Sequence, residues 1–490
     1  MAWGFYGRQE ELRQLGEILA RGRWFFVKLT GRRRIGKTAL IQQALPVANR
    51  RVFYLQVPDS GPAGVLSSVA DALTTFQVDP AIVPRPSSLR ELAGSLGKLA
   101  RAGFVVALDE FQYFNRERLR EFCSHLQQEV DALSADAAAV PGGLLVLGSI
   151  QTEVNALLED RAAPLYNRTT DEIVLGHLDV ESLIALLAAH AEPTPERLLF
   201  LWNLFEGVPK FYRDCYEQGV LGAGRAELLE RAFFLSSSPL RTEADNWFLK
   251  ELHGRYDVVL KYIARHSGCL HGDLISHVRE VSPETGEQVG GYLKVLSERF
   301  QLIERRQPIF AKASAKRGRY YLTDNFLRSW LAALANPISA IHFVPAERLM
   351  AQADERLADI EGHTLEKLVG LLYEERSRKG LGDFALSARI QGFWDRGDTE
   401  IDLVAIDEVS RRIRLASCKR SAERLVGDIV VLDGHVARFM AAHPKYAGWR
   451  VEKVGIAPSI SADIRARLAG AGHLAQDLID LTAEFPVGVR

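Results

Sequence analysis

The stretch Gly-Arg-Arg-Arg-Ile-Gly-Lys-Thr at residues 31–38 constrains the fold of this chain more than any other feature. An apolar segment at residues 24–29 precedes it, and a helical pattern follows it up to Pro46. Gly31 and Gly36 let the backbone curl so that its N–H groups face a phosphate, and the helix adds the positive end of its dipole. The sequence therefore predicts a strand, a phosphate-binding loop and a helix in succession.

The residues of this loop have distinct expected roles. Lys37 is expected to contact the β- and γ-phosphates of ATP, and the hydroxyl group of Thr38 is expected to bind Mg²⁺. ATP and Mg²⁺ are therefore the expected cofactors. The residues predicted to line the nucleotide are Gly31, Arg32, Arg33, Arg34, Ile35, Gly36, Lys37, Thr38 and Ala39.

A second buried-strand pattern, at residues 104–108, ends in two acidic residues, Asp109 and Glu110. An apolar run without alternation is typical of a central parallel strand. Asp109 is expected to hold the Mg²⁺ together with Thr38, and Glu110 is expected to act as general base toward the attacking water. These residues extend the prediction from nucleotide binding to ATP hydrolysis.

Two further polar residues lie next to later strand patterns. Ser149 follows the apolar segment 144–147, where it would either sense the γ-phosphate or cap the next helix. Arg168 precedes a short strand at residues 172–175, and it would serve either as an arginine finger or sensor, or in a structural salt bridge. An arginine finger that acts on a second copy of the chain would make self-association depend on the nucleotide.

Several segments together resemble the prokaryotic "archaeal ATPase" family of the AAA+/STAND branch of P-loop NTPases. The resemblance covers residues 1–235 and is carried by FYGRQEELRQL, TGRRRIGKTAL, ALDEFQYF, GSIQTEV and PLYNRTTDEIVL. It implies a P-loop ATPase core followed by a helical lid. It also implies that Gly7, Arg8 and Glu11 lie on the adenine side and that Pro209, in EGVPKFY, lies near the nucleotide.

The middle of the chain has the pattern of a winged helix-turn-helix, with three helical segments and then two strands. Basic residues outnumber Glu298 and Glu304 in its second half, and such an excess is typical of a surface that contacts DNA phosphates. Because winged helices also dock proteins, a protein partner is the alternative to DNA. The basic residues are Lys294, Arg299, Arg305, Arg306, Lys312, Lys316, Arg317 and Arg319.

The last third has the order helix, strand, strand, helix, which resembles the PD-(D/E)XK nuclease fold that the "archaeal ATPase" family often carries. The resemblance implies a Mg²⁺ site at Glu366 and Asp402, with Lys419 positioning or deprotonating the metal-bound water. Ser417 stands where the family pattern has an acid, and a hydroxyl group is a poorer Mg²⁺ ligand than a carboxylate. Cleavage of DNA and a fold retained for DNA binding or assembly are both open interpretations.

The overall composition limits the remaining possibilities. A formal net charge of -1 means that any nucleic-acid surface must be local. The four cysteines are scattered without a CxxC pair, which argues for a reducing compartment and against a zinc site. No apolar run approaches the roughly 18 residues that suggest a membrane span, so no membrane partner is expected and the expected location is the cytoplasm.

These patterns predict an α/β chain with a parallel P-loop NTPase sheet, a helical lid, a winged helix and a C-terminal α/β nuclease-like domain. A nucleotide-controlled ATPase switch coupled to DNA-binding and nuclease-like domains is the favoured function. An active Mg²⁺-dependent DNA nuclease regulated by ATP and a STAND-type signalling scaffold with a protein partner are the alternatives. The expected boundaries are 1–178 for the core, 179–240 for the lid, 245–336 for the winged helix and 346–490 for the nuclease-like domain.

Overall fold

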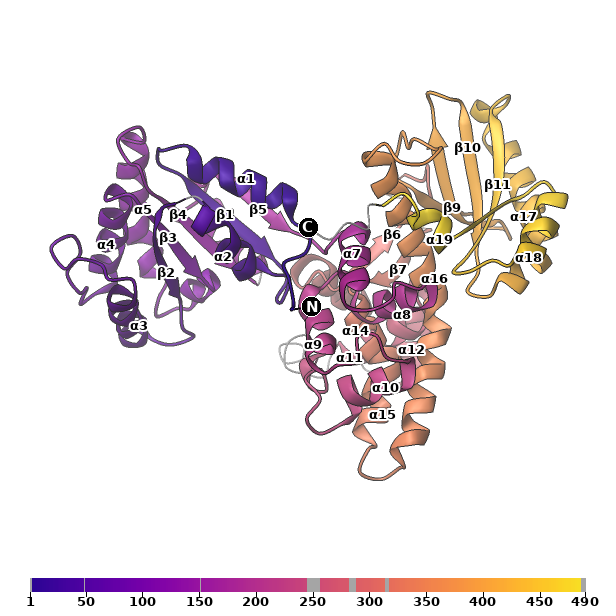
Figure 1. Ribbon diagram of the computed structural model, residues 1–490, viewed down its shortest axis with the longest axis horizontal. Coiled ribbons are helices and arrows are strands. Elements are labelled where there is room, and N and C mark those ends of the chain that lie inside the picture. Colours follow the sequence, from indigo (N-terminus) through magenta and orange to yellow (C-terminus); the bar gives the residue numbers. More distant parts are fainter. Residues whose placement is uncertain are drawn as a thin grey trace. The chain divides into compact units, whose positions relative to one another are not determined.

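The computed structural model describes residues 2–47, 49–149, 151–244, 256–281, 288–312 and 317–485. The chain divides into two compact units (Figure 1). The nucleotide unit comprises Gly7–Leu178 and Val208–Lys210. The C-terminal unit contains the N-terminal segment up to Tyr6, Asp179–Gly207 and the chain from Phe211 onward.

The nucleotide unit is built on a parallel five-stranded sheet with the order β2-β3-β4-β1-β5. All residues of β1, β3 and β4 are buried, in agreement with their continuous apolar patterns. β1 begins two residues later than predicted, since the N–H of Trp24 bonds to the carbonyl of Ala137 instead of a neighbouring strand. The strands are β1 Phe26–Gly31, β2 Arg51–Gln56, β3 Phe104–Asp109, β4 Gly143–Gly148 and β5 Asp171–Leu175.

The helices of this unit bury regular apolar stripes. In α4 (Leu89–Arg101), Ser88 caps the N-terminus by accepting a hydrogen bond from the backbone N–H of Glu91. Leu92 and Leu96 recur at helical spacing on its buried face. The other helices are α1 Gln9–Ala20, α2 Lys37–Val47, α3 Pro62–Thr75, α5 Glu121–Ala135 and α6 Gln151–Leu158.

The first part of the C-terminal unit is mainly helical. Three helices and the antiparallel pair β6–β7 are the elements from which a winged helix was predicted, and that assignment stays a prediction. Residues 245–255, 282–287 and 313–316 of this segment lie outside the described residues. The elements are α7 Val180–His190, α8 Pro195–Phe205, α9 Pro209–Glu217, α10 Arg225–Leu229, α11 Asp257–Arg265, α12 His271–Val281, α13 Val289–Lys294, β6 Ile303–Arg306, β7 Arg319–Leu322, α14 Asn325–Ser329 and α15 Ala335–Ser339.

The second part of this unit is a mixed five-stranded sheet with the order β12-β11-β10-β9-β8. Helix α17 covers one face, where its Val436 and Phe439 pack with Ile406, Ile413 and Leu415 of the sheet. The elements are β8 Gln391–Trp394, β9 Glu400–Asp407, β10 Arg412–Cys418, α17 Ala422–Ala442, β11 Arg450–Ala457, α18 Ala462–Gly470, β12 Leu474–Asp477 and α19 Leu478–Thr482.

A single long helix holds the two parts of the C-terminal unit together. Helix α16 (Ala346–Arg378) has 33 residues and packs against α8 as well as against β9 and β10. Its buried Glu361 forms ion pairs with Arg225 of α10 and with Arg420, which follows β10. The predicted lid, winged-helix and nuclease-like segments therefore belong to one compact unit.

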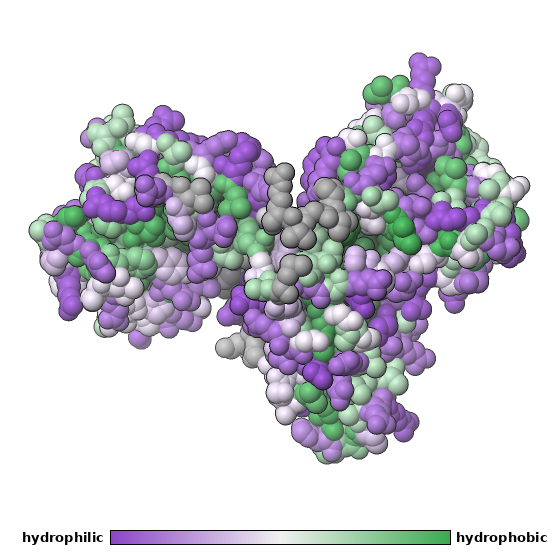
Figure 2. All heavy atoms as spheres, in the orientation of Figure 1, coloured by the Kyte–Doolittle hydropathy of each residue, from purple (hydrophilic) through white to green (hydrophobic). Residues whose placement is uncertain are grey.

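The described helices are all too short or too polar to cross a membrane. Figure 2 shows hydrophilic and hydrophobic residues interspersed on the face that it draws. Large exposed hydrophobic side chains such as Phe343 and Val409 are distant from each other in the sequence. Isolated exposed apolar side chains of this kind are normal on protein surfaces.

Candidate functional site

The predicted phosphate loop curls around the side chain of Lys37. The Nζ atom of Lys37 donates to the carbonyl oxygens of Gly31, at 2.9 Å, and Arg32, at 3.1 Å. Gly36 has a φ of 101°, in the left-handed region that favours glycine. Helix α2 begins at Lys37, so its first backbone N–H groups adjoin the loop. This is the arrangement that binds a phosphate group.

Burial gives Lys37 an electrostatic reason to bind an anion. It lowers the pKa of Lys37 to about 8, although the charges of Glu110 and Asp109 act in the opposite direction. An anionic phosphate at the loop would stabilise the protonated amine and raise this pKa again. The site therefore suits a triphosphate.

Asp109 lies beside the first residues of α2 at the carboxyl end of β3. Its Oδ2 atom accepts hydrogen bonds from the hydroxyl groups of Thr38, at 2.9 Å, and Tyr54, at 2.7 Å. Burial and the charge of Asp109 raise the pKa of Tyr54, so Tyr54 remains a donor. The neighbouring hydroxyl and carboxylate oxygens of Thr38 and Asp109 are ligands that Mg²⁺ prefers. Tyr54 was not predicted from the sequence, because an aromatic residue in a strand resembles an ordinary core residue.

Glu110 is held by two polar side chains. The hydroxyl group of Ser149 donates to Glu110 Oε2 at 2.9 Å, and Gln112 donates to the same carboxylate. Gln112 also lies 3.3 Å from the Ser149 hydroxyl. The structure thus brings Ser149 and Glu110 together, next to Asp109. Gln112 was not predicted, although its position two residues after Glu110 in the same segment was a usable signal.

Arg168 has different neighbours from the other predicted catalytic residues. Its guanidinium forms a two-point ion pair with Asp131 of α5, at 2.6 and 3.0 Å, and a bond to the carbonyl of Tyr166. The pKa of Arg168 is raised, chiefly by the hydrogen bond to Asp131. These contacts favour the structural interpretation of Arg168, while its role in catalysis stays a prediction.

Two residues named by the family resemblance lie close to the phosphate loop. Arg8 donates to the carbonyls of Ile35, at 3.3 Å, and Gly176, at 2.6 Å, and pairs with Glu11 at 3.0 Å. Pro209 is near the loop as well, because a Cβ atom added at Gly36 would be 3.8 Å from the Cγ atom of Pro209. Pro209 belongs to the short segment Val208–Lys210, which is part of the nucleotide unit. The contacts expected between these residues and a nucleotide stay predictions.

The predicted C-terminal residues also converge. Asp402 accepts a hydrogen bond from the backbone N–H of Cys418 at 2.7 Å, and its carboxylate lies 3.8 Å from the Nζ atom of Lys419. Burial, followed by the negative charge of Glu366 on α16, raises the pKa of Asp402 to about 7. His363 is within 3.2 Å of the Glu366 carboxylate. Acids whose pKa is shifted in this way are common in functional sites.

A further acid, Asp428 of α17, occupies the position next to Ser417. Its Oδ2 atom accepts a hydrogen bond from the Ser417 hydroxyl at 3.0 Å and lies 2.9 Å from the Nζ atom of Lys419. Asp428 was not predicted from the sequence. The available signal is its place between Leu425 and Leu432 on the buried stripe of α17, where a carboxylate needs a partner.

Several of the predicted DNA-contacting residues are engaged within the chain. Lys294 lies 3.9 Å from Glu298, Arg306 pairs with Glu304, and Arg319 pairs with Glu400 at 2.5 Å. Lys316 lies outside the described residues. The surface therefore has a lower free positive charge than a count of its basic residues suggests, and DNA contact stays a prediction.

One other acidic cluster, formed by Asp179, Glu181 and Glu375, has a structural explanation. Lys379 pairs with all three carboxylates. Glu375 also accepts hydrogen bonds from the backbone N–H groups of Val180 and Glu181 at the start of α7. An ammonium group and a helix N-terminus already offset part of the negative charge of this cluster.

Comparison with known proteins supports the fold of the nucleotide unit. No family model matches the chain. The uncharacterized protein MJECL04 of Methanocaldococcus jannaschii is 25% identical over 425 residues, which cover 85% of this chain and 87% of that protein. The Walker-type ATPase PABY2304 of Pyrococcus abyssi matches with a TM-score of 0.51 and 19% identity over 67% of this chain and 96% of that one.

A weaker structural likeness, with a TM-score of 0.42 and 15% identity, links the chain to the ORC2 protein of Aeropyrum pernix, over 71% of this chain and 93% of that one. The likeness to the Walker-type ATPase and the order of the parallel sheet confirm the predicted α/β class with a P-loop NTPase sheet.

Proposed function

We propose that this chain binds and hydrolyses ATP with Mg²⁺, and that the nucleotide acts as a switch for the engagement of DNA by the C-terminal unit. The observation that carries the proposal is the assembly of one site from three segments. Lys37 lies within the curled loop, Thr38 bonds to Asp109, and Glu110 is held by Ser149. These are the groups that phosphoryl transfer to water requires.

The residues of this site divide the chemistry among them. Lys37 and the first N–H groups of α2 hold the β- and γ-phosphates. Thr38 and Asp109 supply oxygen ligands for Mg²⁺, which neutralises the charge on the phosphates when it is bound. Glu110 accepts the proton of the attacking water, and the hydrogen bond from Ser149 keeps its carboxylate in position.

A short segment gives the nucleotide a route to the C-terminal unit. Val208–Lys210 belongs to the nucleotide unit, whereas the residues on both sides of it belong to the C-terminal unit. Pro209 of this segment lies against the phosphate loop at Gly36. A nucleotide that displaces Pro209 would therefore pull on α8 and α9 through the backbone itself.

Within the C-terminal unit, two ion pairs to one buried carboxylate continue this route. The carboxylate of Glu361 joins Arg225 of α10, at 2.5 Å, to Arg420, at 2.6 Å. Arg420 follows Lys419 directly in the sequence. The lid and the carboxylate site thus share one buried anion, and breaking either pair would leave it with a single cationic partner.

The first test is ATP turnover by the full chain, with and without DNA and with Lys37→Ala as control. We expect turnover that DNA stimulates and that Lys37→Ala abolishes, because the loop then loses its cation. Turnover equal to wild type in Lys37→Ala would contradict the site. Slow turnover without stimulation by DNA, together with no salt-dependent DNA binding, would instead favour a signalling scaffold with a protein partner.

A second candidate function is Mg²⁺-dependent cleavage of DNA at the C-terminal carboxylates. Asp428 favours it, because this residue brings a carboxylate to Ser417, where the family pattern has an acid. Cutting in Mg²⁺ or Mn²⁺ is expected to disappear in Asp402→Ala and in Lys419→Ala. The absence of cutting by wild type across metals, DNA substrates and nucleotide states would rule this function out.

A further inference from the structure

A cavity of about 360 Å³ lies within the C-terminal unit. One part of its wall comes from the wing segment, defined here as residues 303–312 and 317–322, and the rest comes from α14, α16 and β8–β9. Neither the nucleotide site nor the fold accounts for a polar cavity at this place. Its lining carries five lysine or arginine side chains and four carboxylates, among them Arg306, Arg328, Arg389, Glu366 and Asp402.

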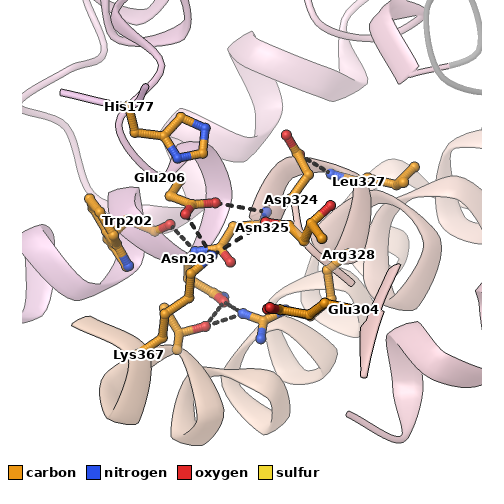
Figure 3. A network of polar contacts seen from close by, with 12 residues as sticks. His177, Trp202, Asn203, Glu206, Glu304, Asp324, Asn325, Leu327, Arg328 and Lys367 are labelled. Carbon is orange, nitrogen blue, oxygen red and sulfur yellow. Dashed lines mark hydrogen bonds and ion pairs between the residues drawn. The ribbon is translucent and has the colours of Figure 1, made fainter. Parts of the chain in front are cut away.

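Arg328 of α14 makes this cavity suited to an anion. Its side chain is buried, and its guanidinium donates to the oxygen atoms of Asn203, at 2.9 Å, and Thr364, which are both neutral (Figure 3). Its Nε atom has no hydrogen-bond partner, and the charges of Glu206 and Glu366 only partly offset its burial. Burial lowers the pKa of Arg328 to about 10. A buried cation in this state gains from an anionic ligand.

The remaining lining combines cations with aromatic rings. Tyr321 and Trp394 both line the cavity. The guanidinium groups of Arg306 and Arg319 lie over these rings, 4.5 and 4.6 Å from the respective centroids. Surfaces that join basic and aromatic side chains are typical of proteins that bind single-stranded nucleic acids.

Contacts with the C-terminal sheet fix the wing segment in place. Ile309 is buried in the same apolar core as Phe393, and its backbone N–H bonds to the carbonyl of Gly392 at 2.9 Å. The indole N–H of Trp394 bonds to the carbonyl of Arg317 at 2.8 Å. The wing segment is therefore a wall of the cavity and is packed against the nuclease-like sheet.

We propose that this cavity binds one nucleotide of a single-stranded nucleic acid, with its phosphate at Arg328 and Arg306. The phosphate would then lie in the same cavity as Glu366 and Asp402. The volume is at the lower end of small-molecule sites and suits one nucleotide rather than a base pair. The inference rests on the proposed engagement of DNA and names the form of DNA that is bound.

The test is equilibrium binding of a 3′-fluorescent, 5′-phosphorylated single-stranded DNA oligonucleotide to the full chain in EDTA, beside the matching duplex. We expect the single strand to bind at least about tenfold more tightly than the duplex, with a salt dependence that reflects phosphate contacts. A nucleoside monophosphate is added as competitor. Competition at a concentration similar to that of the strand would assign the site to free nucleotides and overturn the proposal.

Two variants locate the binding. Arg328→Gln is expected to weaken binding of the single strand at least about tenfold, the range measured for lost charged contacts. Because Arg328 is buried, Arg389→Gln at the exposed edge of the cavity serves as a second variant, and a several-fold loss is expected. Arg467→Gln, at an exposed residue of α18 outside the cavity lining, is the matched control with unchanged binding. Equal binding by Arg389→Gln and wild type would overturn the assignment.

Two variants distinguish a failure of the strand-binding proposal from a failure of the ATPase proposal. Lys37→Ala is expected to keep its affinity for the single strand when no nucleotide is present. The Arg389→Gln variant is expected to keep its ATP turnover in the absence of DNA. Loss of strand binding in Lys37→Ala would show that binding occurs elsewhere, and would overturn the proposal for this cavity without affecting the assignment of the phosphate loop.

Discussion

Two carboxylate sites in this chain are assembled in opposite ways. Asp109 lies at the end of a central strand and accepts hydrogen bonds from two hydroxyl groups, those of Thr38 and Tyr54. Asp402 accepts one backbone hydrogen bond and lies near a second acid, Glu366, which helps to raise its pKa to about 7. Hydrogen-bond donors therefore stabilise the charge of Asp109, whereas Asp402 has too little positive charge around it and would gain more from a bound cation.

The comparison teaches that the two sites depend on ligands to different degrees. In the nucleotide unit, hydroxyl groups and amides organise the acidic residues before a nucleotide binds. In the C-terminal unit, Lys419 is the cation close to both Asp402 and Asp428, at 3.8 and 2.9 Å. The four predictions that follow test this difference.

The largest effect is expected for Glu110→Gln. The amide cannot accept the proton of the attacking water, so the turnover number should fall by about 10²- to 10⁴-fold while ATP still binds. Turnover and nucleotide affinity are measured separately on the same preparation. Ser149→Ala, which removes the hydroxyl bonded to Glu110 and Gln112 but keeps the Glu110 carboxylate, is the matched control and should reduce turnover much less. Wild-type turnover in Glu110→Gln would show that another group acts as the base.

The next effect concerns stability and pH in the presence of EDTA. The pKa of Asp402 is about 7 in the folded protein and about 3.9 in an unfolded chain. The folded state therefore binds the proton more tightly, and the stability of wild type should fall as pH rises through this interval. The free energy of unfolding of wild type should fall by the order of 2–4 kcal/mol between pH values of about 4 and 7, and Asp402→Asn should remove this fall. Parallel denaturation curves for the two proteins at all pH values would contradict the buried, uncompensated state of Asp402.

A smaller effect is expected when the acid on α17 is neutralised. Asp428→Asn should weaken the binding of Mn²⁺ to the C-terminal unit by about 10- to 100-fold, as the loss of a supporting group does in metal sites. Calorimetry without nucleotide, in the Asp109→Asn background, removes the carboxylate ligand of the nucleotide site from the measurement. Ser417→Ala is the control and should change the affinity little, because it leaves all three carboxylates in place. Equal metal affinity of Asp428→Asn and wild type would show that Asp428 does not replace the acid that the family pattern has at position 417.

The smallest effect is expected for Arg168→Ala. The ion pair with Asp131 is partly exposed, and such pairs contribute about 0–1 kcal/mol to stability. Turnover should change little, whereas loss of an arginine finger would reduce it by about 10³-fold or more. A large fall in turnover, and especially one that depends on protein concentration, would assign Arg168 to the active site of a second copy.

The sequence predictions succeed best where the residues of a site are close together in the sequence. The phosphate loop is contiguous and its geometry is local, so the motif alone specifies how Gly31, Lys37 and Thr38 are arranged. Asp109 and Ser149 follow buried strands, and parallel strands bring such ends to one edge of the sheet. No such rule predicts the position of Asp428, because its contact with Ser417 depends on how α17 packs against the sheet.

The cavity was beyond prediction for the same reason. Its walls come from the wing segment, from α14 and from residues after 360, and no periodicity in the sequence predicts that these regions pack together. Arg306 and Arg319 were interpreted as a free basic surface, because the sequence does not reveal their partners Glu304 and Glu400. Charge counts along a sequence therefore overestimate the positive charge that a partner meets.

Helix α16 connects several of the acidic residues of the C-terminal unit mechanically. At a rise of about 1.5 Å per residue it is roughly 50 Å long, and it carries Glu361, Glu366 and Glu375 along its length. A helix held by tertiary contacts at both ends bends little, so a tilt imposed at one end reaches the other as a displacement. The ion pair with Arg225 of α10, the carboxylate beside Asp402 and the residue that anchors α7 therefore all lie on one continuous helix. A proline in the middle of this helix should disconnect them from each other.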